Sequence, residues 1–347
     1  MRTTFILVIL AFFSVNLPVS SFAQIGGDHT YSFLNLTGSP RIAATGGDFL
    51  AVYDHDLALG IVNPSLISQE MHNHLTANFV DYYSDINYGF AGYSRTMPKI
   101  GSFAASVIYV DYGQFDFAYE TGERAGYFYA GETALNLGWG RQLDSSFSIG
   151  SNLKLIYSSL ESYSSFGVAV DVAGTYRDPE RNLAVSLIAK NIGVPIKPYV
   201  SGNMEPLPLE IQIGLSKRLR YLPFRYIINY NHIQKWDLLY DDPDDLQFDP
   251  ITGEVTEKKG FEKTADNLMR HFTVGGEILI SKNLVLRAGY NYKRRQELKV
   301  NSKTSTVGFS WGFGIRISKF HINYARSTYH LAGSPNYISV TTDLGSF

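Results

Sequence analysis

Phe147-Ser-Ile-Gly-Ser-Asn-Leu-Lys-Leu-Ile-Tyr157 is the stretch that decides the fold. Its apolar side chains stand at positions 147, 149, 153, 155 and 157, and small or polar ones at 148, 150, 152 and 154. Successive side chains of a β-strand point to opposite faces, so this stretch predicts a strand with one apolar and one polar face. A strand of about 9–11 residues is long enough to cross a bilayer at a tilt.

The same alternation recurs along the chain, as in Thr133–Trp139, Leu209–Leu215 and Val307–Ile317. We predict about fourteen such strands, an even number as in single-chain bacterial barrels. Their predicted centres are Asn78, Gly89, Val107, Leu135, Leu153, Val170, Leu187, Ile213, Ile228, Val274, Ala288, Ser310, Ile322 and Thr341.

Short and long connections alternate between these segments. The short ones are Thr96–Ile100, Arg141–Ser145, Asp178–Arg181, Arg220–Pro223, Ser281–Asn283 and Ser318–Lys319. The long ones are Gly113–Tyr127, Ile192–Pro206, Gln234–Met269, Arg294–Lys303 and Ser327–Asn336. Outer-membrane barrels have short periplasmic turns and longer extracellular loops. The sequence therefore predicts an all-β fold, a transmembrane antiparallel up-and-down β-barrel in the outer membrane, with both termini periplasmic.

Alternation alone does not say which face is outside, because a soluble β protein would bury the apolar face and expose the charged one. Aromatic residues concentrate near the segment ends, as in the girdles of membrane barrels, and the connections alternate in phase. Both features favour lipid on the apolar side. The polar side then predicts a lumen in which opposite charges pair around a plug, lined by Glu132, Lys154, Asp171, Lys190, Glu210, Glu277, Arg287 and Arg316.

The first residues have the pattern of a secretory signal peptide. Arg2 precedes an apolar run from Phe5 to Leu17, and Ser21-Phe-Ala23 offers small residues for cleavage before Gln24. The run is shorter than the ~20 residues of a spanning helix. We therefore predict a signal peptide at 1–23, an N-terminal plug segment at 24–70 and the barrel at 71–347.

The composition excludes several classes of function. A net charge of -2 argues against a nucleic-acid partner, and the absence of cysteine removes disulfides, thiolate metal sites and cysteine nucleophiles. His72 and His74 lack the further converging ligands that a metal site needs. The acidic stretch from Asp241 to Asp249 lacks the EF-hand spacing, and calcium binding there stays open. We expect no enzyme and no cofactor.

The plug segment contains tight-turn signals at Gly46-Gly47 and at Asn63-Pro64, with Arg41 before them. Together with Phe33-Leu-Asn-Leu36, Ala43-Ala44, Asp54 to Leu57, Met71 to Leu75 and Asp85-Ile-Asn-Tyr88, these residues resemble the opening of the PorQ family of type IX secretion outer-membrane proteins. The match covers about residues 31–95 and is similar, more broadly, to PorV and FadL-like barrels. Pro40 departs from the small residue that the family pattern favours.

The resemblance implies a FadL-like barrel of fourteen strands with an N-terminal plug and no chemistry of its own. It also implies an anchoring role in an attachment complex that processes cargo and couples it to lipopolysaccharide. The implied partners, besides outer-membrane lipid, are a PorZ-like surface protein and PorU- and PorV-like components. The alternative is a FadL-like transporter of hydrophobic small molecules.

A partner would need a surface to bind, and the long connection Gln234–Met269 is the predicted one, since loops longer than ~12–15 residues are often functional. Simple disorder is the competing interpretation. The loop carries candidate apolar anchors at Trp236, Leu238, Leu239, Tyr240, Phe248 and Phe261.

Overall fold

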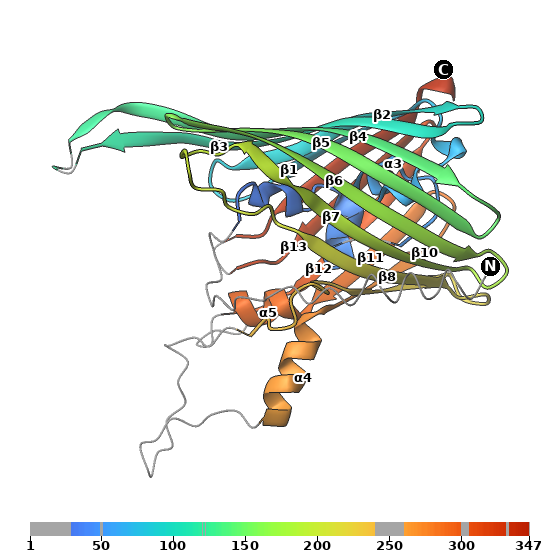
Figure 1. Cartoon of the computed structure of the whole chain (residues 1–347). Helices are drawn as coiled ribbons and strands as arrows, with labels where there is room; N and C mark the ends of the chain where they lie inside the picture. Colours follow the sequence, from blue (N-terminus) through green and yellow to red (C-terminus); the bar gives the residue numbers. More distant parts are fainter. Residues whose placement is uncertain are drawn as a thin grey trace, which may run out of the picture.

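Fourteen antiparallel strands close into a barrel in the computed structural model, which describes residues 29–48, 51–119, 121, 123–239, 260–299, 305–330 and 333–346 (Figure 1). Each strand pairs with its neighbours in the chain, and β1 pairs with β14 to close the ring. The predicted fold class is confirmed, and each predicted centre falls inside one strand. Among the described residues, no helix is long and apolar enough to span a membrane.

The strands run as follows: β1 His74–Asp81, β2 Asn87–Met97, β3 Gly101–Ala118, β4 Arg124–Gln142, β5 Phe147–Leu160, β6 Tyr163–Asp178, β7 Leu183–Lys197, β8 Glu210–Arg218, β9 Phe224–Tyr230, β10 Phe272–Leu279, β11 Leu284–Asn291, β12 Phe309–Ile317, β13 Phe320–Ser327 and β14 Asn336–Asp343. The helices outside the plug are α4 Gly260–Arg270, α5 Tyr292–Leu298 and the short η5 Leu344–Ser346.

The outer wall is apolar and the inner wall is polar. On β5, Leu153 and Tyr157 are 41% and 53% exposed, whereas Asn152 and Lys154 between them are buried. The same inversion holds around the barrel, where large apolar side chains stand exposed on the outside. Such an outer wall is unfavourable in water and favourable in the hydrocarbon of a bilayer, where apolar side chains face lipid. Closure of the barrel also pairs the strand backbones with one another, as a bilayer requires.

A charge on this wall is expected to be costly only at mid-height. Leu153→Arg at the centre of β5 should destabilise the barrel in vesicles, lowering its free energy of unfolding by about 2–4 kcal/mol, as for arginine at a bilayer midplane. The control is Leu143→Arg, since Leu143 is exposed in the turn before β5. Equal effects of the two substitutions on refolding yield and urea stability would contradict a lipid-facing wall.

Four predicted long loops are wrong in detail, because they contain secondary structure. Between Gly113 and Tyr127, β3 continues to Ala118 and β4 begins at Arg124. The two strands form a hairpin that projects past the rest of the barrel (Figure 1). Cross-strand aromatic contacts extend the pairing, as between Phe115 and Phe128, whose stacked rings lie 5.3 Å apart. Likewise β7 continues to Lys197, α4 occupies the end of Gln234–Met269, and α5 occupies the start of Arg294–Lys303.

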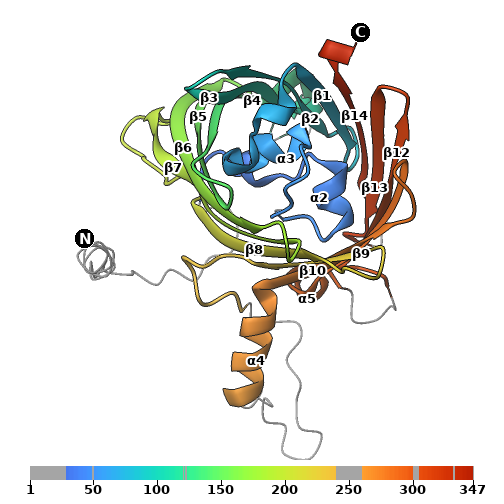
Figure 2. The same cartoon turned by 90° about the vertical axis from the view of Figure 1, so that its right-hand side faces the viewer.

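The plug lies inside the ring of strands (Figure 2). It consists of the short helices η1 Ser32–Asn35, α2 Pro40–Ala44, α3 Leu57–Val62, η2 Pro64–Leu66 and η3 Gln69–Met71. Proline at the first position starts α2, and the Asp56 carboxylate caps α3 by accepting from the Ala58 N–H at 3.1 Å. Apolar side chains of the plug pack against one another around α3 and against wall residues such as Phe90 and Ile227.

The plug threads the barrel from one end to the other. Near its start, the Thr30 N–H donates to the Pro206 carbonyl at 3.1 Å, at the end where the long connections lie. At the opposite end, the Leu344 N–H donates to the Asn73 carbonyl at 2.9 Å, where β1 begins and η5 follows β14. The first described residues therefore lie at one rim and the last at the other. The two termini themselves lie outside the described residues, and their periplasmic placement stays a prediction. The predicted signal peptide and cleavage site lie outside the described residues.

Candidate functional site

Arg41 is the centre of a buried ion cluster that joins the plug to the wall. The one-turn helix α2 holds its guanidinium beside Glu277 of β10, with Nε donating to Oε1 at 2.7 Å and Nη2 to Oε2 at 3.0 Å. The same group donates to Asp54 at 2.8 Å and to Asp56 at 3.2 Å. Since Arg41 is only 6% exposed, these bonds replace nearly all of its hydration.

Two wall arginines complete the cluster. Arg225 of β9 lies 2.6 Å from Glu277 and 3.1 Å from Asp54, and Arg287 of β11 lies 2.9 Å from Glu277. Three guanidiniums thus face the three carboxylates of Glu277, Asp54 and Asp56, and the cluster is neutral. Because a buried ion without its partner costs several kcal/mol, the cluster fixes where the plug sits.

Asp54 remains ionised within this cluster. Burial alone would raise its pKa, but the charges of Arg41 and Arg225 outweigh burial and hold the pKa at about 2. The plug carboxylate is therefore a permanent anion near neutral pH.

One predicted turn motif ties the plug to a residue of α5, and the others shape the plug itself. The Gly46 carbonyl accepts from the Arg294 guanidinium at 3.0 Å, and the Gly47 carbonyl accepts from the Thr37 hydroxyl. Both glycines have positive φ, at 120° and 94°. Asn63 caps the turn that Pro64 begins, with its side-chain oxygen accepting from Ser65 N–H at 3.3 Å.

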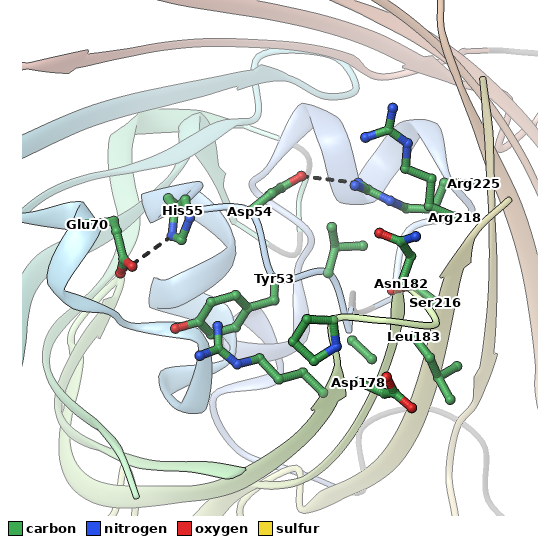
Figure 3. A pocket seen from close by; sticks show the side chains of 14 residues that line it. Tyr53, Asp54, His55, Glu70, Asp178, Asn182, Leu183, Ser216, Arg218 and Arg225 are labelled. Carbon is green, nitrogen blue, oxygen red and sulfur yellow. Dashed lines mark hydrogen bonds and ion pairs between the residues drawn. The ribbon is translucent and has the colours of Figure 1, made fainter. Parts of the chain in front are cut away.

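A polar pocket opens at the short-turn end of the barrel (Figure 3). Its volume is about 450 Å³, in the range of small-ligand sites. Plug residues form one side, and the β6–β7 turn with the ends of β8 and β9 forms the other. The Arg177 guanidinium lies 4.2 Å above the Tyr53 ring, and His55 lies 3.7 Å from Glu70.

A second, smaller chamber lies deeper, between the plug and the inner wall. Its volume is about 60 Å³. The plug contributes Phe33, Leu34 and Leu36, and the wall contributes apolar side chains of β2 and β3 together with the lysines of β5 and β7. Apolar side chains supply most of its surface, and Asp48, Asn136 and Asp171 line the rest together with the two lysines.

An apolar groove lies on the outer side of the same wall. It has a volume of about 570 Å³ and runs over β1, β2 and β3, between exposed Phe79 and Tyr109. Tyr88, Gly89 and Phe90 of β2 line both this groove and the inner chamber. Gly89 has no side chain, so at this point only the strand backbone separates the two spaces.

The predicted internal charge pairing is present elsewhere in the lumen as well. Lys154 lies 2.8 Å from Asp171, and Glu210 lies 2.6 Å from His232. Of the eight charged residues predicted to line the lumen, the structure buries seven, whereas Arg316 is exposed near the end of β12.

The loop residues predicted to bind a partner fall into three groups. Trp236 and Phe261 are exposed, at 56% and 84%. Leu238 is buried, and its N–H donates to Asn267 of α4 at 2.8 Å, so this residue holds the loop together instead of facing outward. Leu239 is half-buried. Tyr240 and Phe248 lie outside the described residues, as does the acidic stretch from Asp241 to Asp249.

Two short motifs found in hydrolases occur in the chain, but the structure gives neither the arrangement that catalysis needs. In Gly308-Phe-Ser-Trp-Gly312, Ser310 is buried within β12 and accepts from Arg294 at 3.3 Å, whereas a nucleophile elbow needs a strand-to-helix turn. In Ser151-Asn-Leu-Lys154, the first and last residues point to opposite faces of β5. Within the described residues, no three His, Asp or Glu side chains converge on a possible metal position.

Sequence reasoning missed Arg225 and the pairing of Asp54 with the wall. The Asp54-His-Asp56 spacing was visible, but the carboxylates of residues 54 and 277 and the guanidinium of residue 41 come together only when the barrel closes. In the sequence, Glu277 was indicated only by its charge at a position on the polar face of a predicted strand.

Comparison with known proteins places the fold. No family model matches the chain, and no curated protein matches it. Among solved structures, it is similar to the toluene transporter TbuX of Ralstonia pickettii, with TM-score 0.53 and 10% identity over 89% of this chain and 99% of that one. The toluene transporter TodX of Pseudomonas putida gives TM-score 0.50 and 12% identity over 87% and 96%. A FadL homologue of Pseudomonas aeruginosa gives TM-score 0.50 and 9% identity over 88% and 98%.

These likenesses show that the fold is that of FadL-type outer-membrane barrels. They agree with the FadL-like part of the resemblance read from residues 31–95. They do not extend to its PorQ-type, type IX secretion part.

Proposed function

We propose that the protein is an outer-membrane barrel that admits small hydrophobic molecules, with the plug as its hatch. The short turns would then face the periplasm. The observation that carries the proposal is the pair of apolar spaces on either side of Tyr88-Gly-Phe90. A hydrophobic molecule dissolved in the membrane meets one of them from outside, and the other receives it within the lumen. The likeness to two toluene transporters supports the same class of ligand.

The sizes of these spaces define what the hatch must do. A cavity of about 150 Å³ lined by apolar side chains holds one benzene molecule, whereas the inner chamber has about 60 Å³. A ring-sized molecule therefore enters only when plug side chains such as Phe33 and Leu36 move aside. The ion cluster of Arg41 does not line the chamber, so the plug can adjust there while remaining anchored at β10.

The test is uptake by cells in which this barrel is the only added protein, with radiolabelled toluene and oleate as probes. Accumulation above that of cells with an empty vector is expected. Ile108→Trp replaces an aliphatic side chain of the chamber with an indole ring. It should reduce uptake by at least about fivefold, since overfilling a packed site costs about 1–3 kcal/mol.

The matched control is Ile149→Trp, because Ile149 lies on the outer wall of β5 and is remote from the chamber lining. It should leave uptake unchanged. Uptake equal to the empty-vector level in the unmodified protein would overturn the proposal, as would equal loss in the two variants.

Anchoring a PorZ-like surface protein in a type IX attachment complex is the second candidate. It draws on the match over residues 31–95, whose quoted positions form the plug and the first hairpin, and on a lumen that is filled. An anchor needs no passage, and a plugged barrel meets that need without rearrangement. The wall would hold the protein in the membrane while its long connections contact PorZ-, PorU- and PorV-like partners.

Purification of the tagged protein from native outer membrane in mild detergent distinguishes the candidates. Stoichiometric recovery of a secreted surface protein supports anchoring. Recovery of the barrel alone, together with saturable uptake of the hydrophobic probes, contradicts anchoring and leaves passage as the function.

A further inference from the structure

Helix α4 leaves the barrel at the rim that carries the long connections. It ends at Arg270, directly before β10 begins at Phe272. Figures 1 and 2 are turned by 90° relative to each other, and α4 points away from the barrel in both. The helix therefore projects across the barrel axis and not along it, so in a membrane it would run beside the barrel at one bilayer surface.

One face of α4 is apolar and exposed. Phe261, Ala265, Leu268 and Met269 stand at i, i+4, i+7 and i+8, which is one stripe of a helix. Phe261 is 84% exposed, Leu268 40% and Met269 47%. No other described part of the chain covers these three side chains.

The opposite face of α4 is held by the protein. The Asn267 side chain donates to the Trp236 carbonyl at 2.7 Å and accepts from the Leu238 N–H at 2.8 Å. Asp266 accepts from the Tyr292 hydroxyl of α5 at 2.7 Å and lies 3.2 Å from Arg270. These bonds set the rotation of the helix about its axis, so the apolar stripe is presented outward by construction.

The base of α4 adjoins the aromatic rim of the lipid-facing wall. The Tyr230 ring packs 5.1 Å from Phe272 and 4.9 Å from His271, and Trp236 stacks on His271 at 5.5 Å. Val274, two residues after Phe272 on β10, is the next outward-facing side chain and is 44% exposed. Tyrosine and tryptophan gather where the hydrocarbon meets the headgroups. The apolar stripe is thus continuous with the surface that the membrane covers.

We propose that α4 is an interfacial membrane helix, whose stripe of Phe261, Leu268 and Met269 is buried among lipids beside the barrel. An amphipathic helix in this position buries its apolar face at the boundary of headgroups and acyl chains. The exposed apolar residues of the Gln234–Met269 connection then bind lipid, and a protein partner would bind at another surface. This inference is independent of what the barrel transports.

The absence of cysteine makes the test direct. Full-length Phe261→Cys carrying an environment-sensitive fluorophore is reconstituted in vesicles of phosphatidylcholine and phosphatidylglycerol, with or without lipids spin-labelled near the headgroup. The label is expected to shift to the blue and to lose at least half of its emission to the spin-labelled lipid. The matched variant Lys263→Cys, on the opposite side of the same turn, should show neither change.

Equal response of the two positions, with free access of iodide to the label at residue 261, would overturn the proposal. The proposal would also be overturned if iodide reached the label at residue 261 in lipid vesicles that contain this protein alone, but not in native outer membrane. That result would indicate a protein partner. Because Phe261 is exposed and Lys263 is partly exposed, neither substitution is expected to affect folding, which retained gel mobility of the folded barrel verifies.

Discussion

Glu277→Gln is expected to lower the free energy of unfolding by about 3–5 kcal/mol, the cost of removing one partner from a buried ion cluster. Glu277 is fully buried and accepts from Arg41, Arg225 and Arg287. Without its charge, three guanidiniums face only Asp54 and Asp56, and the cluster carries a net positive charge that water reaches from the polar pocket, beside Asp54 and Arg225. Both the wall at β9–β11 and the seat of the plug lose stability.

The measurement is urea unfolding in detergent micelles, followed by the gel mobility of the folded barrel, with trypsin cleavage of the plug as a second readout. Glu180→Gln is the matched control, since Glu180 is exposed in the β6–β7 turn and should change stability by no more than about 0.5 kcal/mol. Adding Arg287→Met to Glu277→Gln should recover part of the loss. Indistinguishable stability of Glu277→Gln and Glu180→Gln would refute the role given to the cluster.

Gly150→Ala and Gly289→Ala are each expected to displace the plug. A Cβ at residue 150 would stand 2.2 Å from the Pro64 carbonyl carbon, and one at residue 289 would stand 2.2 Å from that of Thr45. Both obstacles are backbone atoms, so no rotamer change relieves them. With a cost of about 1–3 kcal/mol for each added methyl, the population with a displaced plug should rise at least about fivefold.

Conductance across planar bilayers measures this effect, because a displaced plug opens a wet lumen to ions. The double variant should show frequent long openings where the unmodified barrel stays closed. Gly174→Ala provides the control for adding a methyl group to the wall. Its Cβ would have no neighbour closer than 4.0 Å, so its conductance should equal that of the unmodified protein. Equal conductance of all variants would show that the wall glycines do not seat the plug.

The resemblance to PorQ-type proteins and the likeness to toluene transporters meet at the plug. Some residues that carry the resemblance, such as Arg41 and Gly46, hold the plug in the lumen and do not line the chamber, whereas Phe33 to Leu36 do line it. The residues that hold the plug therefore indicate how the barrel is closed, and they do not indicate what it carries. What passes through the barrel, or binds to its rim, depends on other surfaces, and the experiments above examine each of them separately.

The sequence by itself determined the number of strands, their centres, and which side chains face outward. Alternation is a local property, because consecutive side chains of any strand point to opposite faces whatever the rest of the chain does. That is why Leu153 and Lys154 could be assigned to opposite sides of the wall before any fold was known. Loop lengths were less predictable, since cross-strand aromatic pairs extend β3 and β4 beyond the barrel.

Only the tertiary structure decided where the plug rests and which charges meet. Arg41 and Glu277 are 236 positions apart, and they lie 2.7 Å from each other because closure of the ring through β1 and β14 fixes the register of every strand around the plug. The same closure brings Tyr88-Gly-Phe90 between two apolar spaces and directs α4 away from the wall. A local pattern specifies which face of a strand a residue occupies, but its partner across the lumen depends on the geometry of the whole barrel.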